Sequence, residues 1–320
     1  PSRRRGIANP DVRVLLPAAR AGPCVGRGPN AMHIARSWPR GRTLLTLARL
    51  PNLPTVWSNC LAAWLLSGGG PVGRLLWACV GTSLLYWGGT FLNDYFDVDF
   101  DRQHRTDRPI PAGHISASLT GQLGAAGLTA GFLALVAGAH ASLLATLLLI
   151  ASIVVYDVVH KATELSPVLI AICRFLLYLV AGSTARDGVS GIAIWSAFAM
   201  AGYVGGLSCF ARREAIRGPI RRWPIALLTL PVGLALISNA GEYLQIAAWL
   251  SVLLALWVLP CLRHALRDTN PRIGLTVSGL LAGIILVDLL AVAGQSVGVA
   301  LIFGALFLTA LLTQRYIAAT

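Results

Sequence analysis

The most informative part of the sequence joins an apolar stretch, LLWACVGTSLLYWGGTFL (residues 75–92), to an acidic one, NDYFDVDFDRQHRTDRPIPAG (residues 93–113). The first stretch has no charged side chain and is close to the roughly 20 residues that a helix needs to cross a bilayer. The second stretch begins with Asp94, Asp97, Asp99 and Asp101, although the whole chain has only 13 acidic residues. A predicted membrane helix therefore ends in the densest group of carboxylates in the protein.

The composition excludes an ordinary soluble domain. Of the 320 residues 56% are hydrophobic and only 12% are charged, and the mean hydropathy is +0.69. A soluble domain has about 25% charged residues. Apolar runs of about 20 residues recur along nearly the whole length, without the period-two alternation of a membrane β-barrel. We therefore predict an all-α, polytopic transmembrane helical bundle.

The apolar runs predict a bundle of nine to ten helices. Their expected bounds are residues 44–67, 74–98, 117–139, 141–159, 166–183, 191–211, 223–239, 243–263, 273–293 and 297–314. The fourth and seventh runs are short, and only the sequence AGQSVG separates the last two. For these reasons the predicted number of helices stays between nine and ten.

Basic residues are concentrated in every second connection between the runs. These connections and the C-terminus carry Arg102, Arg105, Arg108, Lys161, Arg212, Arg213, Arg217, Arg221, Arg222, Arg263, Arg267, Arg272 and Arg315. The opposite connections carry only Arg74 and Arg186. Short basic loops stay on the cytoplasmic side of a membrane, so we expect the acidic stretch to face the cytoplasm from a bacterial inner membrane. The same rule accounts for the net charge of +13 without a nucleic-acid partner.

The beginning of the chain differs from the rest. Residues 1–31 are rich in Arg, Pro and Gly and lack a long apolar core, so they form neither a membrane helix nor an ordinary signal peptide. Met32 then opens a basic lead into the first apolar run. We expect residues 1–31 to be a tail or a mis-assigned start, and residues 32–320 to form a single membrane domain.

The carboxylates near residue 97 can share one face of a helix. If the second helix continues to Arg102, a rotation of about 100° per residue turns Asp99 away from the other oxygen-bearing side chains. The side chains that share the face are Asn93, Asp94, Asp97 and Asp101. Carboxylates near an apolar boundary are costly without a cation, and hard oxygen ligands of this kind suit Mg²⁺. The alternative is a solvated acidic helix end interleaved with arginines.

Arginines and prolines follow the carboxylates directly. Arg105 and Arg108 precede Pro109 and Pro111, which fix the path of the chain as it leaves the helix. Guanidinium groups bind phosphate oxygens in pairs, and Mg²⁺ is often held jointly by carboxylates and phosphates. Metal ligands beside arginines therefore indicate a diphosphate site, which favours the metal interpretation.

Residues 93–113 resemble the first aspartate-rich motif of the UbiA superfamily of intramembrane prenyltransferases. The matching positions are Asn93, Asp94, Asp97, Asp101, Arg105, Arg108, Pro109, Pro111 and Gly113. The resemblance implies helices around a central, lipid-accessible cavity, with Mg²⁺ held by the Asn and Asp side chains against a prenyl diphosphate. It also implies that Asp97 and Asp101 are catalytic and that both arginines bind substrate.

A second match lies in VYDVVHKATELSP, residues 155–167. This stretch resembles the Tyr-x-x-x-Lys region of the same family, with one more residue between the two members. The resemblance implies that Tyr156 binds substrate and that Lys161, the only lysine of the chain, contacts the diphosphate during catalysis. An ordinary loop cation is the alternative for Lys161.

The second aspartate motif of the family, approximately DxxxD, has no equivalent in YVGGLSCFARREAIRG, residues 203–218. Glu214 is the only carboxylate there, so the resemblance implies at most one surviving metal ligand at this place. Arg212 and Arg213 are expected to neutralise the diphosphate directly, because guanidinium groups can also stabilise leaving-group charge. Coordination of a second Mg²⁺ stays open.

Polar residues inside apolar runs are further candidates for the functional site. A polar side chain costs free energy in a bilayer, so it is usually found there only where it has a function. These residues are Arg49, Asn52, Asn59, Arg174, Tyr178 and Asp288. For Asn59 and Arg174 we expect substrate binding, with bonding between helices as the alternative. Asp288 is expected to be a packing partner.

These features predict a Mg²⁺-dependent prenyltransferase that works inside a bilayer. The expected substrates are a prenyl diphosphate and a small acceptor of aromatic character, and no protein partner is required. Two alternatives stay open. One is a terpene cyclase on the same scaffold, in which the prenyl chain captures its own cation. The other is a protein that binds or transports lipid diphosphates without chemistry.

Overall fold

The computed structural model describes residues 41–215, 223–266 and 273–316, which all belong to one compact unit. The predicted tail at residues 1–31 and the predicted start at Met32 lie outside the described residues. The side chains of Arg213 and Glu214, at the end of a described helix, are outside them as well.

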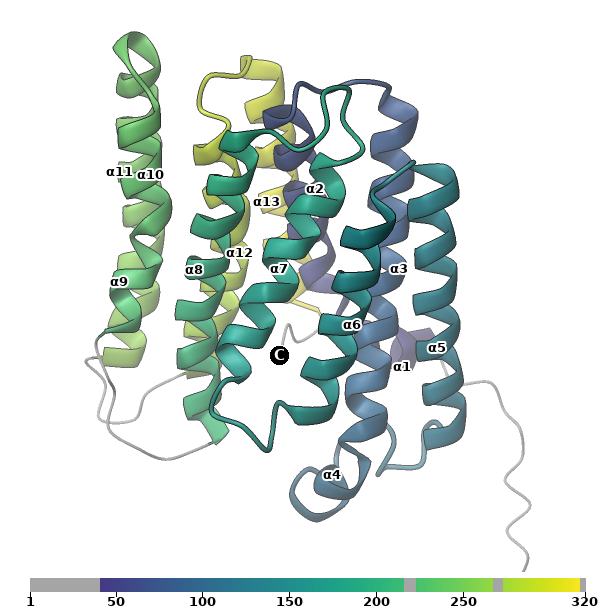
Figure 1. The fold of residues 1–320 in the computed structure, drawn as a ribbon. Helices are drawn as coiled ribbons and strands as arrows, with labels where there is room; N and C mark the ends of the chain where they lie inside the picture. The colour runs from purple at the N-terminus through teal and green to yellow at the C-terminus, as the bar shows by residue number, and fades with distance from the viewer. Residues whose placement is uncertain (1–40, 216–222, 267–272, 317–320) are drawn as a thin grey trace, which may run out of the picture. The chain divides into compact units, whose positions relative to one another are not determined.

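Helices make up the described chain from its start to its end (Figure 1). The first part contains α1 (Gly41–Leu47), the 3-10 helix η1 (Leu50–Asn52), α2 (Leu53–Leu66), α3 (Val72–Phe96), α4 (Val98–His104), α5 (Ala117–Leu133) and the π-helix η2 (Ala134–Gly138). The second part contains α6 (Leu143–Val159), α7 (Ser166–Gly182), α8 (Gly191–Ala215), α9 (Pro224–Leu228), α10 (Leu230–Ser238), α11 (Gly241–Leu266), α12 (Ile273–Ala291) and α13 (Val297–Gln314).

The predicted all-α membrane class is confirmed. Six helices of the described segments are long and apolar enough to cross a membrane, namely α3, α5 with η2, α8, α11, α12 and α13. Shorter apolar helices lie at residues 143–159, 166–182 and 224–238. Their positions match the predicted runs to within a few residues, because long apolar segments can bury their backbone polar groups only as helix.

The first predicted segment, residues 44–67, is not one helix. Helix α1 ends at Leu47, Arg49 adopts a left-handed conformation with φ of 45°, and a regular α-helix resumes only at Leu53. Pro51 and Pro54 favour the break, because proline lacks the backbone N–H that would continue the helical hydrogen bonds. The break places the side chain of Arg49 against the end of α3.

Glycines allow α3 and α5 to approach closely. A Cβ atom at Gly88 of α3 would lie 2.8 Å from the backbone nitrogen of Leu128 and 2.9 Å from the carbonyl oxygen of Gly124. Small residues of this kind are typical of packed membrane helices, where close backbone contact replaces the hydrophobic effect. The contact fixes α3 against its neighbour along the length that leads to the acidic stretch.

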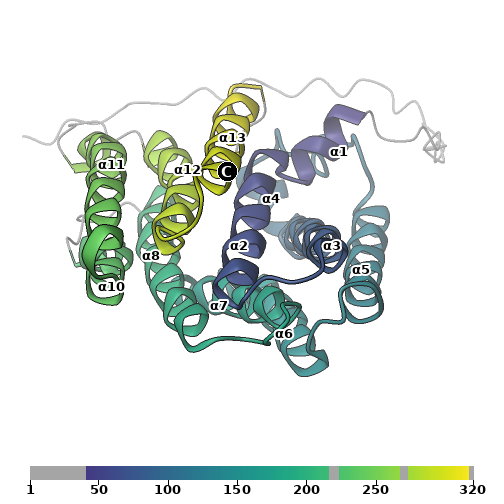
Figure 2. The same ribbon diagram turned by 90° about the horizontal axis from the view of Figure 1, so that it is seen from above.

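Helix α2 packs against α3, α7, α12 and α13, and α11 packs against α12 (Figure 2). The buried core between these helices includes Tyr178, Tyr203, Leu280 and Ile284. Several segments that are far apart in sequence therefore meet around α2.

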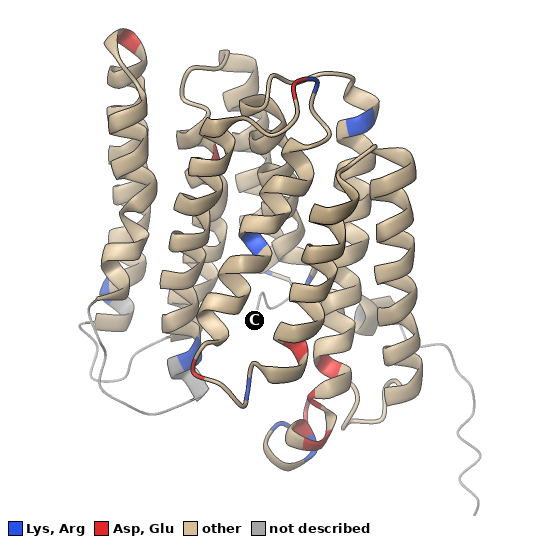
Figure 3. Cartoon of the chain, viewed as in Figure 1, with Lys and Arg blue, Asp and Glu red and all other residues tan. Residues whose placement is uncertain are grey.

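Charged residues are densest at the end of the helices where α3, α6 and α8 finish and α7 begins, with a few more at the opposite end (Figure 3). Helix α4 and the connection between α6 and α7 lie at this end (Figure 1). The acidic stretch of α3 and α4 is thus brought beside basic residues from other segments.

Candidate functional site

The acidic stretch continues from α3 into α4 with only a slight break at Asp97. The backbone N–H of Asp97 donates to the carbonyl oxygen of Asn93 at 3.0 Å, and that of Asp101 donates to the carbonyl oxygen of Asp97 at 2.9 Å. The helical spacing of hydrogen bonds is therefore kept across the junction. Asn93, Asp94 and Asp101 are buried. The Asp99 side chain is 84% exposed and forms an ion pair with Arg102. The predicted orientation of these residues, with Asp99 turned away, is confirmed.

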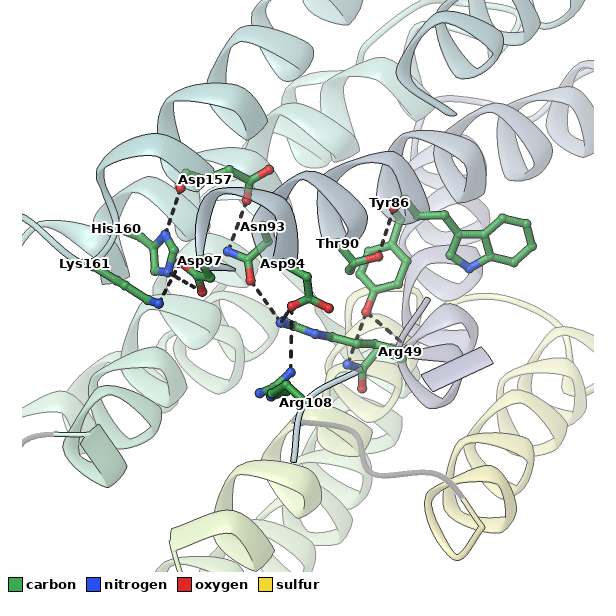
Figure 4. Close-up of polar contacts among 12 residues, drawn as sticks. Arg49, Tyr86, Thr90, Asn93, Asp94, Asp97, Arg108, Asp157, His160 and Lys161 are labelled. Atoms are coloured by element: carbon green, nitrogen blue, oxygen red, sulfur yellow. Dashed lines mark hydrogen bonds and ion pairs between the residues drawn. The ribbon is translucent and has the colours of Figure 1, made fainter. Parts of the chain in front are cut away.

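Asp94 is neutralised by arginines from two other segments (Figure 4). One carboxylate oxygen lies 3.6 Å from Nη2 of Arg49 and 3.8 Å from Nη1 of Arg108. Nη2 of Arg49 also donates to Oδ1 of Asn93 at 3.0 Å. The segments before and after α3 in the sequence therefore each supply a guanidinium group to its end.

Asp97 is paired with the end of α6. Nζ of Lys161 lies 2.8 Å and Nε2 of His160 lies 3.6 Å from its carboxylate oxygens. Burial raises the pKa of the Asp97 carboxyl, but the hydrogen bonds and positive charge supplied by His160 and Lys161 outweigh burial and hold this pKa below its usual value. Nζ of Lys161 also lies 3.8 Å from the centre of the Phe100 ring. Lys161 is therefore part of the acidic site and not an isolated loop cation.

A further carboxylate, Asp157 of α6, reaches the same place. Its Oδ1 accepts a hydrogen bond of 3.4 Å from Nδ2 of Asn93. Asp157 and Asp101 are each only 4% exposed. Among the described residues, Oδ2 of Asp157 and Oδ1 of Asp101 have no hydrogen-bond partner. Buried polar atoms are nearly always paired, so these two oxygens point to a ligand or a reaction.

The donor chemistry of the site fits Mg²⁺. Its side chains offer carboxylate and amide oxygens, and Oδ1 of Asp101 is buried without a partner in residues 41–215, 223–266 and 273–316. Among the residues that the structure describes, no three His, Cys, Asp or Glu side chains form a ready cage for a metal. Mg²⁺ commonly takes one or two carboxylates and completes its shell with water and phosphate oxygens, so a complete protein cage is not required.

Three other predicted site residues lie outside the group of carboxylates and cations at the end of α3. Tyr156 stacks on His160, with ring centres 5.1 Å apart, at the edge of the acidic site. Arg105 is exposed. Arg212 holds the connection between α6 and α7 by donating to the carbonyl oxygen of Thr163 at 2.5 Å and to Oγ of Ser166 at 3.1 Å. Substrate binding by these three residues stays a prediction.

Asn59 and Arg174 belong to a second polar cluster that joins α2, α7 and α12. Nη1 of Arg174 donates to Oδ1 of Asn59 at 2.7 Å, and Nδ2 of Asn59 donates to Oδ2 of Asp288 at 2.7 Å. Asp288 also accepts from Ser58 at 2.6 Å and from the hydroxyl of Tyr178. These contacts show bonding between helices, which was the alternative for Asn59 and Arg174, and they give Asp288 the expected packing role.

Sequence reasoning missed Asp157 and His160. Both lie beside Lys161 in the stretch that carries the second family match, and residues 157, 160 and 161 share one face of a helix by their spacing of three and four. This spacing is the feature of the sequence that could have indicated their place in the site.

Comparison with known proteins places the chain in a family. The sequence profile of the UbiA prenyltransferase family matches residues 53–318. The chain is 40% identical over 67 residues to 4-hydroxybenzoate octaprenyltransferase of Cupriavidus necator, which is 20% of this chain and 22% of the relative. It is 42% identical over 77 residues to the enzyme of the same name from Thiobacillus denitrificans, covering 22% and 26% of the two chains.

An archaeal relative and two solved structures agree with this match. Digeranylgeranylglyceryl phosphate synthase of Korarchaeum cryptofilum is 39% identical over 56 residues, which is 18% of this chain and 20% of the relative. A UbiA homologue from Aeropyrum pernix K1 has a TM-score of 0.59 and 17% identity, covering 74% of this chain and 94% of that chain. A structure from work on digeranylgeranylglyceryl phosphate synthase has a TM-score of 0.54 and 16% identity, covering 84% and 97%. At this identity the solved structures show a shared fold.

Proposed function

Because the chain belongs to the UbiA prenyltransferase family and is an integral membrane protein, we propose that it transfers a prenyl group from a prenyl diphosphate to a small acceptor in a Mg²⁺-dependent reaction. The aligned parts cover only 22% and 26% of the first two relatives, so their names suggest an acceptor class without fixing it. An electron-rich aromatic acceptor is our choice, and 4-hydroxybenzoate is the first compound to test.

The observation that carries this proposal is the meeting of carboxylates and cations at the end of α3. Asp94 pairs with Arg49 and Arg108, and Asp97 pairs with Lys161, each cation coming from a different segment. A site with both kinds of group can take Mg²⁺ on its oxygens and a diphosphate on its cations. A solvated acidic helix end would not bury Asp94 and Asp101.

Each residue has a definite part in the proposed reaction. Asn93, Asp94, Asp97 and Asp101 would hold the metal, with Glu214 as a further candidate. When bound, Mg²⁺ stabilises the negative charge that develops on the leaving diphosphate. Arg108 and Lys161 bind the same oxygens and orient the diphosphate, and Arg105, Arg212 and Arg213 add positive charge around it. Tyr156 is assigned to the walls that face the substrates. For Asn59 and Arg174, contact with a substrate would come in addition to their bonds between α2, α7 and α12.

We also propose a location in the cell for the protein and an arrangement of its helices around the substrates. We assign the acidic end of α3 to the cytoplasmic side of a bacterial inner membrane, because basic loops flank it. Nine to ten helices would surround a central cavity open to lipid, through which the prenyl tail enters. An apolar cavity would keep water away from the prenyl cation.

The proposal is tested with purified protein in lipid nanodiscs, Mg²⁺ or EDTA, 4-hydroxybenzoate, and geranylgeranyl or octaprenyl diphosphate. We expect Mg²⁺-dependent release of diphosphate together with prenylated acceptor. Asp97→Ala and Asp101→Ala should reduce turnover by more than about 100-fold, beyond the range for loss of a residue that only supports a metal ligand, while the protein still inserts. Asp99→Asn is the matched control and should keep full activity, because Asp99 points into solvent.

The alternatives give different results in the same assay. Release of diphosphate with a cyclic hydrocarbon or alcohol, with or without acceptor, would identify a terpene cyclase. Binding of a prenyl diphosphate without any release would identify a binding or transport protein. Equal binding and turnover in EDTA would refute the metal site.

A further inference from the structure

Asp157 is a buried carboxyl group that the proposed diphosphate site does not use. It lies on α6 and is 4% exposed, and none of the ion pairs among the described residues includes it. Its Oδ1 accepts from Asn93, whereas its Oδ2 has no hydrogen-bond partner in the part of the chain that the structure describes. A carboxyl group inside an apolar helix is costly to bury with an unused oxygen. The unused oxygen therefore requires an explanation.

The unused oxygen lies deeper along α3 than the metal ligands. A Cβ atom placed on Gly89 would lie 3.9 Å from Oδ2 of Asp157, and Gly89 precedes Asn93 by one helical turn. A diphosphate bound at residues 93–101 directs its prenyl carbon away from the charged end of the helices and toward the apolar segments. Oδ2 of Asp157 is thus on the side where the reacting carbon and the acceptor would meet.

Neighbouring side chains hold this carboxyl group in place. Nδ2 of Asn93 bonds to Oδ1 of Asp157, and the amide of Asn93 is itself oriented by Arg49. One turn later His160 and Lys161 are paired with Asp97, which fixes the end of α6 against α3 (Figure 4). A reactive group held by its own neighbours in this way loses little freedom when substrates bind.

We propose that Oδ2 of Asp157 accepts the proton that the acceptor loses on prenylation. The inference rests on the proposed transferase function. The bond between the prenyl C1 and the diphosphate oxygen breaks, and its electron pair stays on the diphosphate. An electron pair of the acceptor forms the new bond to C1, and the proton on the attacking atom moves to Oδ2. The carboxylate becomes a neutral carboxylic acid and later returns the proton to water.

The decisive variant is Asp157→Asn, which has nearly the same shape. The asparagine oxygen can still accept from Nδ2 of Asn93, but the amide nitrogen that replaces Oδ2 cannot take up a proton. The probes are Mg²⁺, 4-hydroxybenzoate and geranylgeranyl diphosphate labelled with ¹⁸O at the bridging oxygen. Movement of the label to non-bridging positions reports reversible C–O cleavage, and prenylated product reports the complete reaction.

We expect Asp157→Asn to lower product formation by about 100-fold or more, the size of a general-base contribution. Label movement, and binding of the unreactive analogue geranylgeranyl S-thiolodiphosphate, should stay within about twofold of wild type. Asp157→Ala should lose product formation to a similar extent and regain part of it with added formate. Asp99→Asn again serves as the matched control and should change neither readout.

Other results would overturn the role of Asp157. Product formation by Asp157→Asn within about threefold of wild type would leave Asp157 with only its structural bond to Asn93. Joint loss of label movement and analogue binding would assign it to the diphosphate site instead. Wild-type protein that moves the label without forming any product would refute the proton transfer and keep the diphosphate site. Wild-type protein that does neither would refute the proposed function, and this role with it.

Discussion

At the scale of single residues, the acidic end of α3 is balanced by cations that come from distant parts of the chain. Arg49 precedes α2, Arg108 follows α4, and Lys161 follows α6. Without these partners Asp94 and Asp97 would repel each other at an apolar boundary. The same cations are free to exchange their carboxylate partners for phosphate oxygens when a diphosphate arrives, because both are charge-assisted hydrogen-bond acceptors.

The ion pair between Asp97 and Lys161 predicts a dependence of stability on pH. Because the folded pKa of Asp97 lies below its usual value, the pair stabilises the fold above the unfolded pKa of about 3.9. This contribution is lost as the pH falls further, through the folded pKa. We expect Lys161→Met to lower the midpoint of thermal unfolding at pH 7 and to have a smaller effect near about pH 3. Midpoints measured in detergent at both pH values check this.

The control for this prediction is Arg102→Met. Arg102 also pairs with an aspartate of the acidic stretch, but both side chains are mostly exposed, and such pairs contribute little. A pH-independent effect of Lys161→Met would show that Lys161 acts through its contact with Phe100 and not through Asp97.

At the scale of helices, the path of α3 depends on its contact with α5. Gly88 and Gly127 lie in this contact, and a Cβ atom on Gly127 would come within 3.0 Å of the Cα atom of Gly88. The atoms that would be struck belong to the backbone and cannot turn away as a side chain would. This close packing sets the position of α3, and so of the acidic stretch at its end, relative to α5.

Substitution of Gly88 tests this packing. Gly88→Ala places its methyl group 2.8 Å from the Leu128 nitrogen, so α3 and α5 must separate. We expect a loss of about 1–3 kcal/mol in the free energy of unfolding, measured by titration with sodium dodecyl sulfate in mixed micelles. The matched variant is Gly73→Ala on the same helix, where a Cβ atom meets nothing within 4 Å. Equal stability of both variants would contradict close packing at Gly88.

At the scale of the whole described unit, one buried aspartate joins helices from the beginning, middle and end of the chain. Asp288 of α12 is 0% exposed and accepts from Ser58 and Asn59 of α2 and from Tyr178 of α7. Arg174 extends the cluster by donating to Asn59 and to Oγ1 of Thr55. In a bilayer such bonds hold helices together where apolar contacts alone distinguish poorly between partners.

Removal of the Asp288 carboxylate should therefore destabilise the bundle. Asp288→Ala leaves the donors of Asn59 and Tyr178 without their acceptor, while Ser58 keeps its bond to the carbonyl oxygen of Thr55, and each unsatisfied donor costs about 1–3 kcal/mol. We expect a total loss of about 3 kcal/mol or more in the same micelle titration. Glu242→Gln, at the exposed start of α11, should stay within about 0.5 kcal/mol of wild type. An unchanged midpoint for Asp288→Ala would show that the cluster does not hold the helices together.

The class of the fold, the positions of most helices and the orientation of the acidic stretch can be predicted from the amino-acid sequence alone. Long apolar runs leave only helix as a way to satisfy the backbone in lipid, and a period of 3.6 residues turns Asp99 away from Asp94, Asp97 and Asp101. These features are local, so the order of residues along one segment is enough to predict them.

Only the tertiary structure decided which distant groups meet. It brought Arg49 to Asp94, Lys161 to Asp97 and Asp157 to Asn93, and it joined Asn59 to Asp288. Such pairs depend on the break before α2, on close glycine contacts and on helix packing. Apolar periodicity does not specify which face of one membrane helix touches which face of another, because lipid and protein are similarly apolar surroundings.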